Sequence, residues 1–111
     1  MLLFRFHDKP HTNKTPGHWF ASLRVAVKQA KKRDVKKVYL NKGLSNIKKG
    51  AKPNNRPDVM VHKRNGNVDQ YEVPSRTDIP RKLLKRMQKN QKILGKKGLM
   101  KLVNIKKRKR R

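Results

Sequence analysis

Apolar residues recur at helical spacing in two stretches of the chain. In the first stretch they follow Thr15-Pro16, which indicates a helix that begins at Pro16 and is capped by Thr15. The repeating apolar positions are Phe20, Leu23, Val27 and Ala30. The helix should end in the cluster 31–34, since cations are favourable at a helix C-terminus.

The second helical stretch follows Asp78-Ile79-Pro80. Here Asp78 is the expected cap, and Gly95 is a natural stop because glycine readily adopts the left-handed conformation that ends many helices. The apolar positions between them are Leu83, Leu84, Met87 and Leu94.

The remaining apolar segments are short and predict strands. A short run in residues 1–6 predicts an edge strand, and residues 35–40 and 100–105 predict two more. A lysine-containing loop covers 41–55, and 57–75 reads as a hairpin. This order predicts a small α/β (α+β) domain: a mixed sheet with a central hairpin, flanked by two helices. We expect one domain over 1–105 and an all-basic tail over 106–111.

The hairpin turn at Asn65-Gly66 decides which side chains share a face. A two-residue turn would place Asp58 and Glu72 on opposite faces of the hairpin. A three-residue turn, 64–66 with Gly66 left-handed, pairs Lys63 with Asn67 and sets Asp58 opposite Glu72. Only the second register sorts Val59, Val61, Tyr71 and Val73 onto one apolar face, so we expect the three-residue turn.

The net charge of this 111-residue chain limits the classes of ligand that it is expected to bind. It has 33 Lys and Arg against 6 Asp and Glu, a net charge of +27. Such a chain is expected to bind a polyanion, and nucleic acid is the leading candidate. No apolar run approaches the ~18 residues of a membrane span, and the absence of Cys excludes disulfides and thiolate metal sites.

The few acids are concentrated where a phosphate binder would gain nothing from them. Asp58, Asp69 and Glu72 fall within fifteen residues. Carboxylates embedded in a basic surface suggest a metal ion or proton transfer. Asp58 and Glu72 are the candidate ligands of one Mg²⁺ or Mn²⁺ ion. The alternative is that both acids merely pair with neighbouring Lys and Arg.

The hairpin resembles the PD-(D/E)XK nuclease superfamily, which places Pro-Asp on one strand and an acid on the next. Here these are Pro57-Asp58 and Glu72. More narrowly, residues 18–95 resemble nuclease domains at the C-termini of bacterial polymorphic and contact-dependent growth inhibition toxins. The matching segments, in order, are 41–44, Arg56-Pro57-Asp58-Val59 and Glu72-Val73-Pro74-Ser75.

The resemblance implies an endonuclease toxin of the hydrolase class, with RNA, and first tRNA, favoured over DNA. Asp58 and Glu72 would hold the metal, with Gln70 and Ser75 assisting catalysis. It also implies an acidic immunity protein as partner, and action in the cytoplasm of a target bacterium after export within a larger carrier.

The chain departs from the motif at two points. Pro74 stands where the motif has Lys, so Lys63 or a loop Lys would have to replace that amine. The first helix also lacks the Glu that members often have there. A metal-independent ribonuclease with His18 or His62 as acid or base therefore stays open.

Nucleic-acid contacts are expected from cations near the hairpin and on the second helix, which would bind phosphates without reading sequence. The named candidates are Arg56, Lys63, Arg76, Arg81, Lys82 and Lys85. The rival class is a non-catalytic nucleic-acid-binding protein of ribosomal or phage type, for which the net charge and the basic tail are sufficient.

Overall fold

The computed structural model describes residues 4–6, 16–75 and 77–103. Its elements are strands and helices in a mixed order along the chain. They are β1 (Phe4–Phe6), α1 (Pro16–Ala30), β2 (Val35–Leu40), a 3-10 turn η1 (Leu44–Asn46), β3 (Val59–Lys63), β4 (Val68–Glu72), α2 (Pro80–Leu94) and β5 (Met100–Leu102). The predicted order of helix, strand, hairpin, helix and strand is confirmed, and with it the small α/β class.

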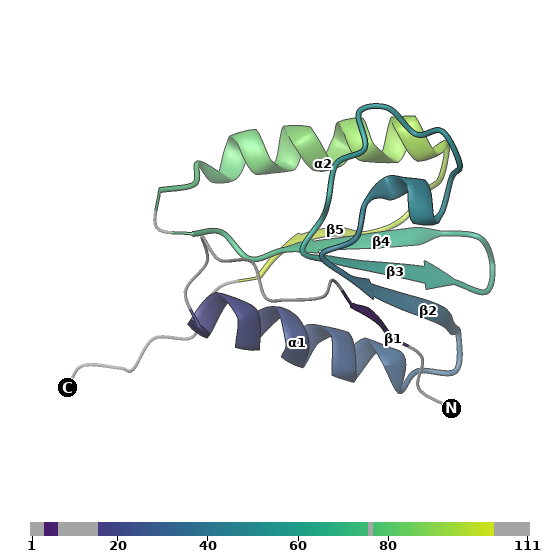
Figure 1. Cartoon of the computed structure of the whole chain (residues 1–111), viewed down its shortest axis with the longest axis horizontal. Helices are drawn as coiled ribbons and strands as arrows, with labels where there is room; N and C mark the ends of the chain where they lie inside the picture. Colours follow the sequence, from purple (N-terminus) through teal and green to yellow (C-terminus); the bar gives the residue numbers. More distant parts are fainter. Residues whose placement is uncertain (1–3, 7–15, 76, 104–111) are drawn as a thin grey trace.

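The strands form one five-stranded mixed sheet in the order β1-β2-β3-β4-β5. Only β3 runs against its neighbours, because β1 pairs with β2 and β4 pairs with β5 in parallel. A parallel pair needs a crossover connection, and here α1 and α2 provide the two crossovers. Figure 1 shows α1 on one face of the sheet and α2 on the other.

The predicted hairpin register is confirmed. Val59 pairs with Tyr71 and His62 with Val68. The turn is closed by the Lys63 amide, which donates to the Asn67 carbonyl at 2.8 Å. Gly66 has φ +96°, a conformation that residues with a Cβ rarely adopt. The three-residue turn therefore sets the facing pairs of the whole hairpin.

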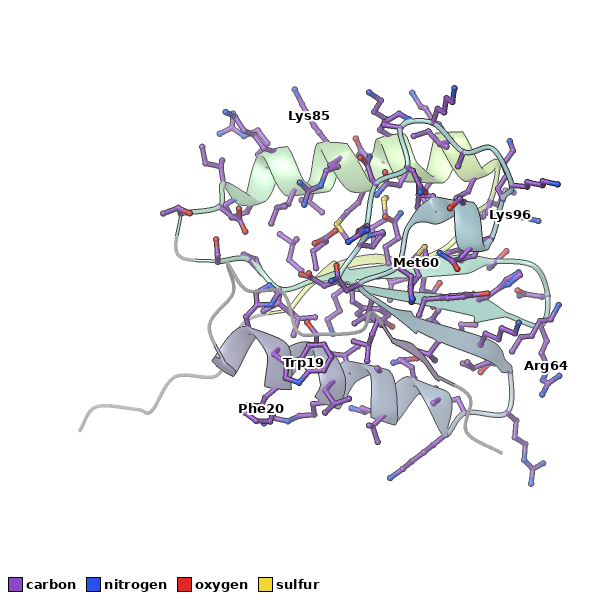
Figure 2. All side chains as sticks on the ribbon, viewed as in Figure 1. Trp19, Phe20, Met60, Arg64, Lys85 and Lys96 are labelled. Carbon is purple, nitrogen blue, oxygen red and sulfur yellow. The ribbon has the colours of Figure 1, made fainter. Side chains whose placement is uncertain are left out.

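Both faces of the sheet are buried, whereas the sequence pattern indicated one apolar face. Under α1 the core holds Val38, Leu40, Val59, Val61 and Tyr71. Under α2 a second cluster holds Tyr39, Leu44, Met60, Val68 and Leu94. The second cluster exists because parallel pairing places a helix over each face. Figure 2 shows Met60 between the sheet and α2.

The expected helix ends are confirmed in part. α1 begins at Pro16, while its expected cap Thr15 lies outside the described residues. The expected cap of α2 is wrong: Ile79 occupies that position, and its side chain makes no capping bond. The Asp78 carboxylate instead accepts a hydrogen bond from the Ser75 amide at 2.8 Å, and so closes the turn before the helix. At the other end Gly95 has φ 65° and ends α2 as predicted.

The predicted strand over 100–105 is observed over Met100–Leu102, and residues 104–105 lie outside the described part. The first strand is present at Phe4–Phe6 within the predicted run 1–6. The basic tail over 106–111 lies outside the described residues as well.

Candidate functional site

Features that attract an anionic ligand lie at one end of the sheet, where most of its strands have their C-termini. We call this end of the sheet its C-terminal edge. β1, β2, β4 and β5 run in the same direction, so their C-terminal ends meet at this edge, next to the start of β3. Each helix is the next element after one of these strands, and the N-termini of α1 and α2 lie at the same edge (Figure 1, left). Ligands of open α/β sheets commonly bind at this position, where helix N-termini favour negative charge.

Asp58 lies at this edge, one residue before β3. Its side chain is largely buried and its Oδ2 accepts a 2.7 Å hydrogen bond from the amide of Val73. The same oxygen lies 3.2 Å from Nε2 of His18, which is in the first turn of α1. The carboxylate is therefore fixed from two sides, by the chain that follows β4 and by α1.

Glu72 ends β4 at the same edge, and one further step of the hairpin register sets it opposite Asp58. Glu72 is 3% exposed. Its Oε1 lies 3.7 Å from Nη2 of Arg86, which projects from α2. The facing positions agree with the prediction, but the two carboxylates contact different helices, Asp58 contacting α1 and Glu72 contacting α2.

Asp58 and Glu72 are the residues at this edge that could hold a divalent cation. No group of three or more His, Cys, Asp or Glu in the described ranges is arranged to hold a metal. A cation bound here would therefore take most of its oxygen ligands from water and phosphate. Mg²⁺ commonly binds in this way, through one or two carboxylates. The donor set suits Mg²⁺ or Mn²⁺.

Gln70, an expected catalytic helper, lies on the face covered by α2 and is fully buried. Its Nε2 donates to the carbonyl of Met87 at 2.9 Å and to Oε1 of Gln91 at 2.6 Å. Its Oε1 accepts from Nδ2 of Asn90 at 2.9 Å. Both ends of the amide are thus engaged with α2, so this side chain fixes the helix on the sheet.

The polar network continues from Gln70 into the basic loop. Asn90 Oδ1 accepts from Nδ2 of Asn55 at 2.8 Å. Near the other end of the loop, Lys48 Nζ donates to the carbonyl of Ile93 at 3.1 Å. The loop over 41–58 is therefore held against α2, and its lysines join the cations of that helix on one side of the molecule. This contact could not be predicted from the sequence, because Asn90 lies among the polar residues of α2, which are typical of an exposed helix face.

Ser75 lies in the segment that connects β4 to α2, three residues after Glu72. Its amide donates to Asp78, and its Oγ lies 3.4 Å from Oγ1 of Thr77. These contacts of Ser75 are within its own turn. Arg76, a candidate phosphate ligand, lies outside the described residues.

Lys63 lies at the opposite end of the hairpin from the acid pair. Its Nζ is 2.8 Å from Oδ2 of Asp34 and 3.7 Å from Oδ2 of Asp69. The hydrogen bond that Lys63 donates to Asp34 raises the pKa of Lys63, and the same bond lowers the pKa of Asp34. Five residues of strand separate Lys63 from Asp58, about 17 Å. Lys63 therefore lies too far from the acid pair to contact a ligand bound at the two carboxylates.

The two candidate histidines differ in position. His18 touches Asp58, as described above, whereas His62 is near the hairpin end of β3. Burial lowers the pKa of His62, and the nearby cations Lys36, Lys96 and Lys37 lower it further. Only His18 therefore lies with the acid pair. Its sequence position on an apolar helix could not show this contact.

Each acid in the described residues has a defined neighbour. Asp69 Oδ1 accepts from the amide of Leu99 at 2.8 Å and so joins β4 to the segment before β5. Asp34 pairs with Lys63, and Asp78 accepts a hydrogen bond from the Ser75 amide. Of the acids that crowd the hairpin, Asp69 thus has a structural role, while Asp58 and Glu72 remain at the edge of the sheet.

The cations of α2 are exposed. Figure 2 shows Lys85 pointing outward from this helix. We call the exposed set the α2 face: Arg81, Lys82, Lys85, Arg86, Lys89 and Lys92. Arg56, also exposed, follows Asn55 in the loop held against α2. Through Arg86 the α2 face reaches the acid pair directly.

Compared with models of protein families, with curated proteins and with solved structures, the chain matches none of them. Among its described helices, neither has the length and apolar character needed to cross a membrane.

Proposed function

We propose that this domain is an endonuclease whose reaction takes place at the edge occupied by Asp58 and Glu72. The observation that carries the proposal is the hairpin register. Continued by one step, it sets two carboxylates at facing positions, beside two helix N-termini and next to Arg86 of α2. Carboxylates disfavour binding of a polyanion, so their presence in a chain of net charge +27 supports a role in chemistry rather than in affinity.

The residues divide the work in the proposed reaction. Asp58 and Glu72 hold one Mg²⁺ or Mn²⁺ ion, which when bound polarises the phosphate and lowers the pKa of the attacking water. Arg86, 3.7 Å from Glu72, is placed to hold a phosphate oxygen next to that carboxylate. Among the described residues, Arg86 is our candidate for the cation that replaces the Lys of the PD-(D/E)XK motif. His18 orients Asp58, and Ser75 closes the turn that leads from Glu72 towards α2.

The biological setting follows from the resemblance to toxin nuclease domains. We propose RNA as substrate, with tRNA first and DNA second, and action in the cytoplasm of a target bacterium after delivery by a larger carrier. An acidic immunity protein would cover the cationic edge in the producing cell.

A second candidate is a non-catalytic nucleic-acid-binding protein. It is favoured by the observation that each described acid already has a neighbour in the fold, including Asp58 with the Val73 amide and Glu72 with Arg86. In that case both carboxylates serve to fix the edge of the sheet.

Turnover with and without the carboxylates distinguishes the two candidates. Wild type, Asp58→Asn and Glu72→Gln are incubated with total tRNA and with plasmid DNA, in Mg²⁺ or EDTA, and resolved on denaturing gels. The endonuclease predicts cleavage by wild type, loss of at least 100-fold in both variants, and unchanged or tighter binding in a gel-shift assay. Binding by all three proteins without cleavage would favour the binder. Circular dichroism of the variants verifies that they fold.

A further inference from the structure

The outer side of α1 carries a groove that neither the sheet nor the acid pair uses. Its volume is about 500 Å³, within the range of roughly 300–1,000 Å³ that is usual for ligand sites. Its lining comes from one side of the helix: Phe20, Leu23, Arg24, Val27, Lys28 and Lys31. Figure 2 shows Phe20 on the side of α1 that faces away from the sheet, while Trp19 is turned toward it.

Folding does not account for Phe20. Trp19 and Leu23 pack against the core beneath α1, but Phe20 is 58% exposed. An exposed aromatic ring beside partly buried Leu23 and Val27 leaves an apolar strip in contact with water. Burying a side chain of this size contributes roughly 1.5–3 kcal/mol. The strip is therefore a surface that gains from being covered.

The charges around the strip select its occupant. Arg24, Lys28 and Lys31 are exposed and border the groove at helical spacing. A matching ligand must bring apolar side chains to Phe20 and Val27 and carboxylates to the three cations. The lining extends from position 20 to position 31, about 16 Å or three helical turns. An amphipathic helix with acidic flanks presents these groups at the same spacing.

We propose that the α1 groove is a docking site for an acidic amphipathic helix of a protein partner. A second copy of this chain would bring another net charge of +27 to a surface that is already basic. A nucleic-acid strand would find one aromatic ring, Phe20, followed by the aliphatic Leu23 and Val27, whereas single-strand binders stack successive bases on several aromatic rings. The groove is lined by other residues than the acid pair, so the proposal stands whether or not the domain is a nuclease.

The test uses the whole chain and two synthetic peptides of the same composition. One is an 18-residue helix with Leu on a single stripe and Glu on both sides of it, and the other has the same residues scrambled so that no stripe forms. Trp19, the single tryptophan, lies next to Phe20 and reports binding by its fluorescence. We expect the striped peptide to bind at least tenfold more tightly than the scrambled one. Phe20→Ala should remove that difference.

Leu99→Ala is the matched control, since Leu99 is 51% exposed on another part of the surface. It should bind both peptides as the wild type does. Equal binding of the two peptides, or an undiminished preference in Phe20→Ala, would show charge attraction alone and overturn the proposal. It would also be overturned if sedimentation showed a dimer that Phe20→Ala abolishes, or if a short RNA protected Phe20 and the striped peptide did not. Circular dichroism and the cleavage assay should be unaffected in Phe20→Ala.

Discussion

His18 in the first turn of α1 places its Nε2 3.2 Å from Oδ2 of Asp58, at the start of β3. This contact joins a helix to the strand that carries the first acid of the candidate site, across forty residues of sequence. Through this contact α1 reaches the candidate site, although the helix has no carboxylate of its own.

The first prediction concerns this contact. His18→Leu keeps the size of the side chain but removes its polar atoms, so the Asp58 carboxylate loses one of the groups that fix it. Cleavage should fall about 10- to 100-fold, because misplacement of a catalytic group by about 1 Å costs that order of rate. His18→Gln keeps a donor and should retain most of the activity. Activity of His18→Leu equal to wild type in the tRNA assay, at equal helix content, would remove His18 from the site.

A second prediction separates support from catalysis at Gln70. Gln70→Met removes the bonds to Asn90, Met87 and Gln91 inside a buried region. Each buried polar group that loses its partner costs about 1–3 kcal/mol, so unfolding in urea should show a loss of about 2–4 kcal/mol. The double variant Gln70→Met/Asn90→Leu should lose less than the sum of the two single changes, since they share one bond. Full additivity would mean that the two amides do not act together.

Much of the fold was predictable because local signals agreed with one another. Pro16 and Gly95 mark helix ends by their backbone chemistry, and the three-residue turn at Gly66 followed from sorting apolar side chains onto one face. The cap at Asp78 was wrong because an Asp before a helix can bond the turn that precedes it, here through Ser75. The position of Asp78 relative to the helix is the same whether its carboxylate caps the helix or bonds the preceding turn, so the sequence does not distinguish the two.

The site was predictable only as far as the hairpin determines it. Strand pairing is local, so the facing positions of Asp58 and Glu72 followed from the turn. Contacts with the helices are long-range, and nothing in the spacing showed that His18 reaches Asp58 or that Arg86 reaches Glu72. The burial of Gln70 was missed for the same reason, because the second helix covers a face that looked polar.

A third prediction concerns which cation supplies positive charge next to the acid pair. Lys63 is about 17 Å from the acid pair and is held by Asp34, whereas Arg86 adjoins Glu72. Lys63→Gln should therefore leave the cleavage rate within about twofold of wild type, while Arg86→Gln should lower it at least tenfold. Single-turnover rates on one tRNA measure both. The reverse order of effects would place the supporting cation at the hairpin instead.

A fourth prediction is a loss of stability on acidification that depends on His62. Its pKa is lowered in the folded protein by burial and by Lys36, Lys96 and Lys37, so the unfolded chain binds the proton more readily. The resulting stability is fully present above the unfolded pKa of about 6.5 and is lost as pH falls through that value toward the folded pKa. Urea unfolding at pH 7.5 and pH 5 measures it.

His62→Gln provides the control for that measurement, because it removes the titrating group and keeps a polar side chain. Its stability should fall less than that of wild type between the two pH values. A proton NMR titration should also show the His62 pKa rising when a polyanion binds, since the polyanion offsets the surrounding lysines. Identical pH dependence in wild type and His62→Gln would contradict the prediction.

The last prediction locates the nucleic-acid surface by its dependence on salt. Binding to phosphates releases counterions, so the slope of log K against log salt changes by about 0.7–0.9 for each contact. Changing Lys82, Lys85 and Lys89 of the α2 face to Gln should reduce the magnitude of that slope by about 2–3. The matched triple on α1, Arg24, Lys28 and Lys31 to Gln, removes the same charge from the opposite face and should leave the slope near that of wild type. Equal reductions in the two triples would mean that net charge, rather than the α2 face, determines binding.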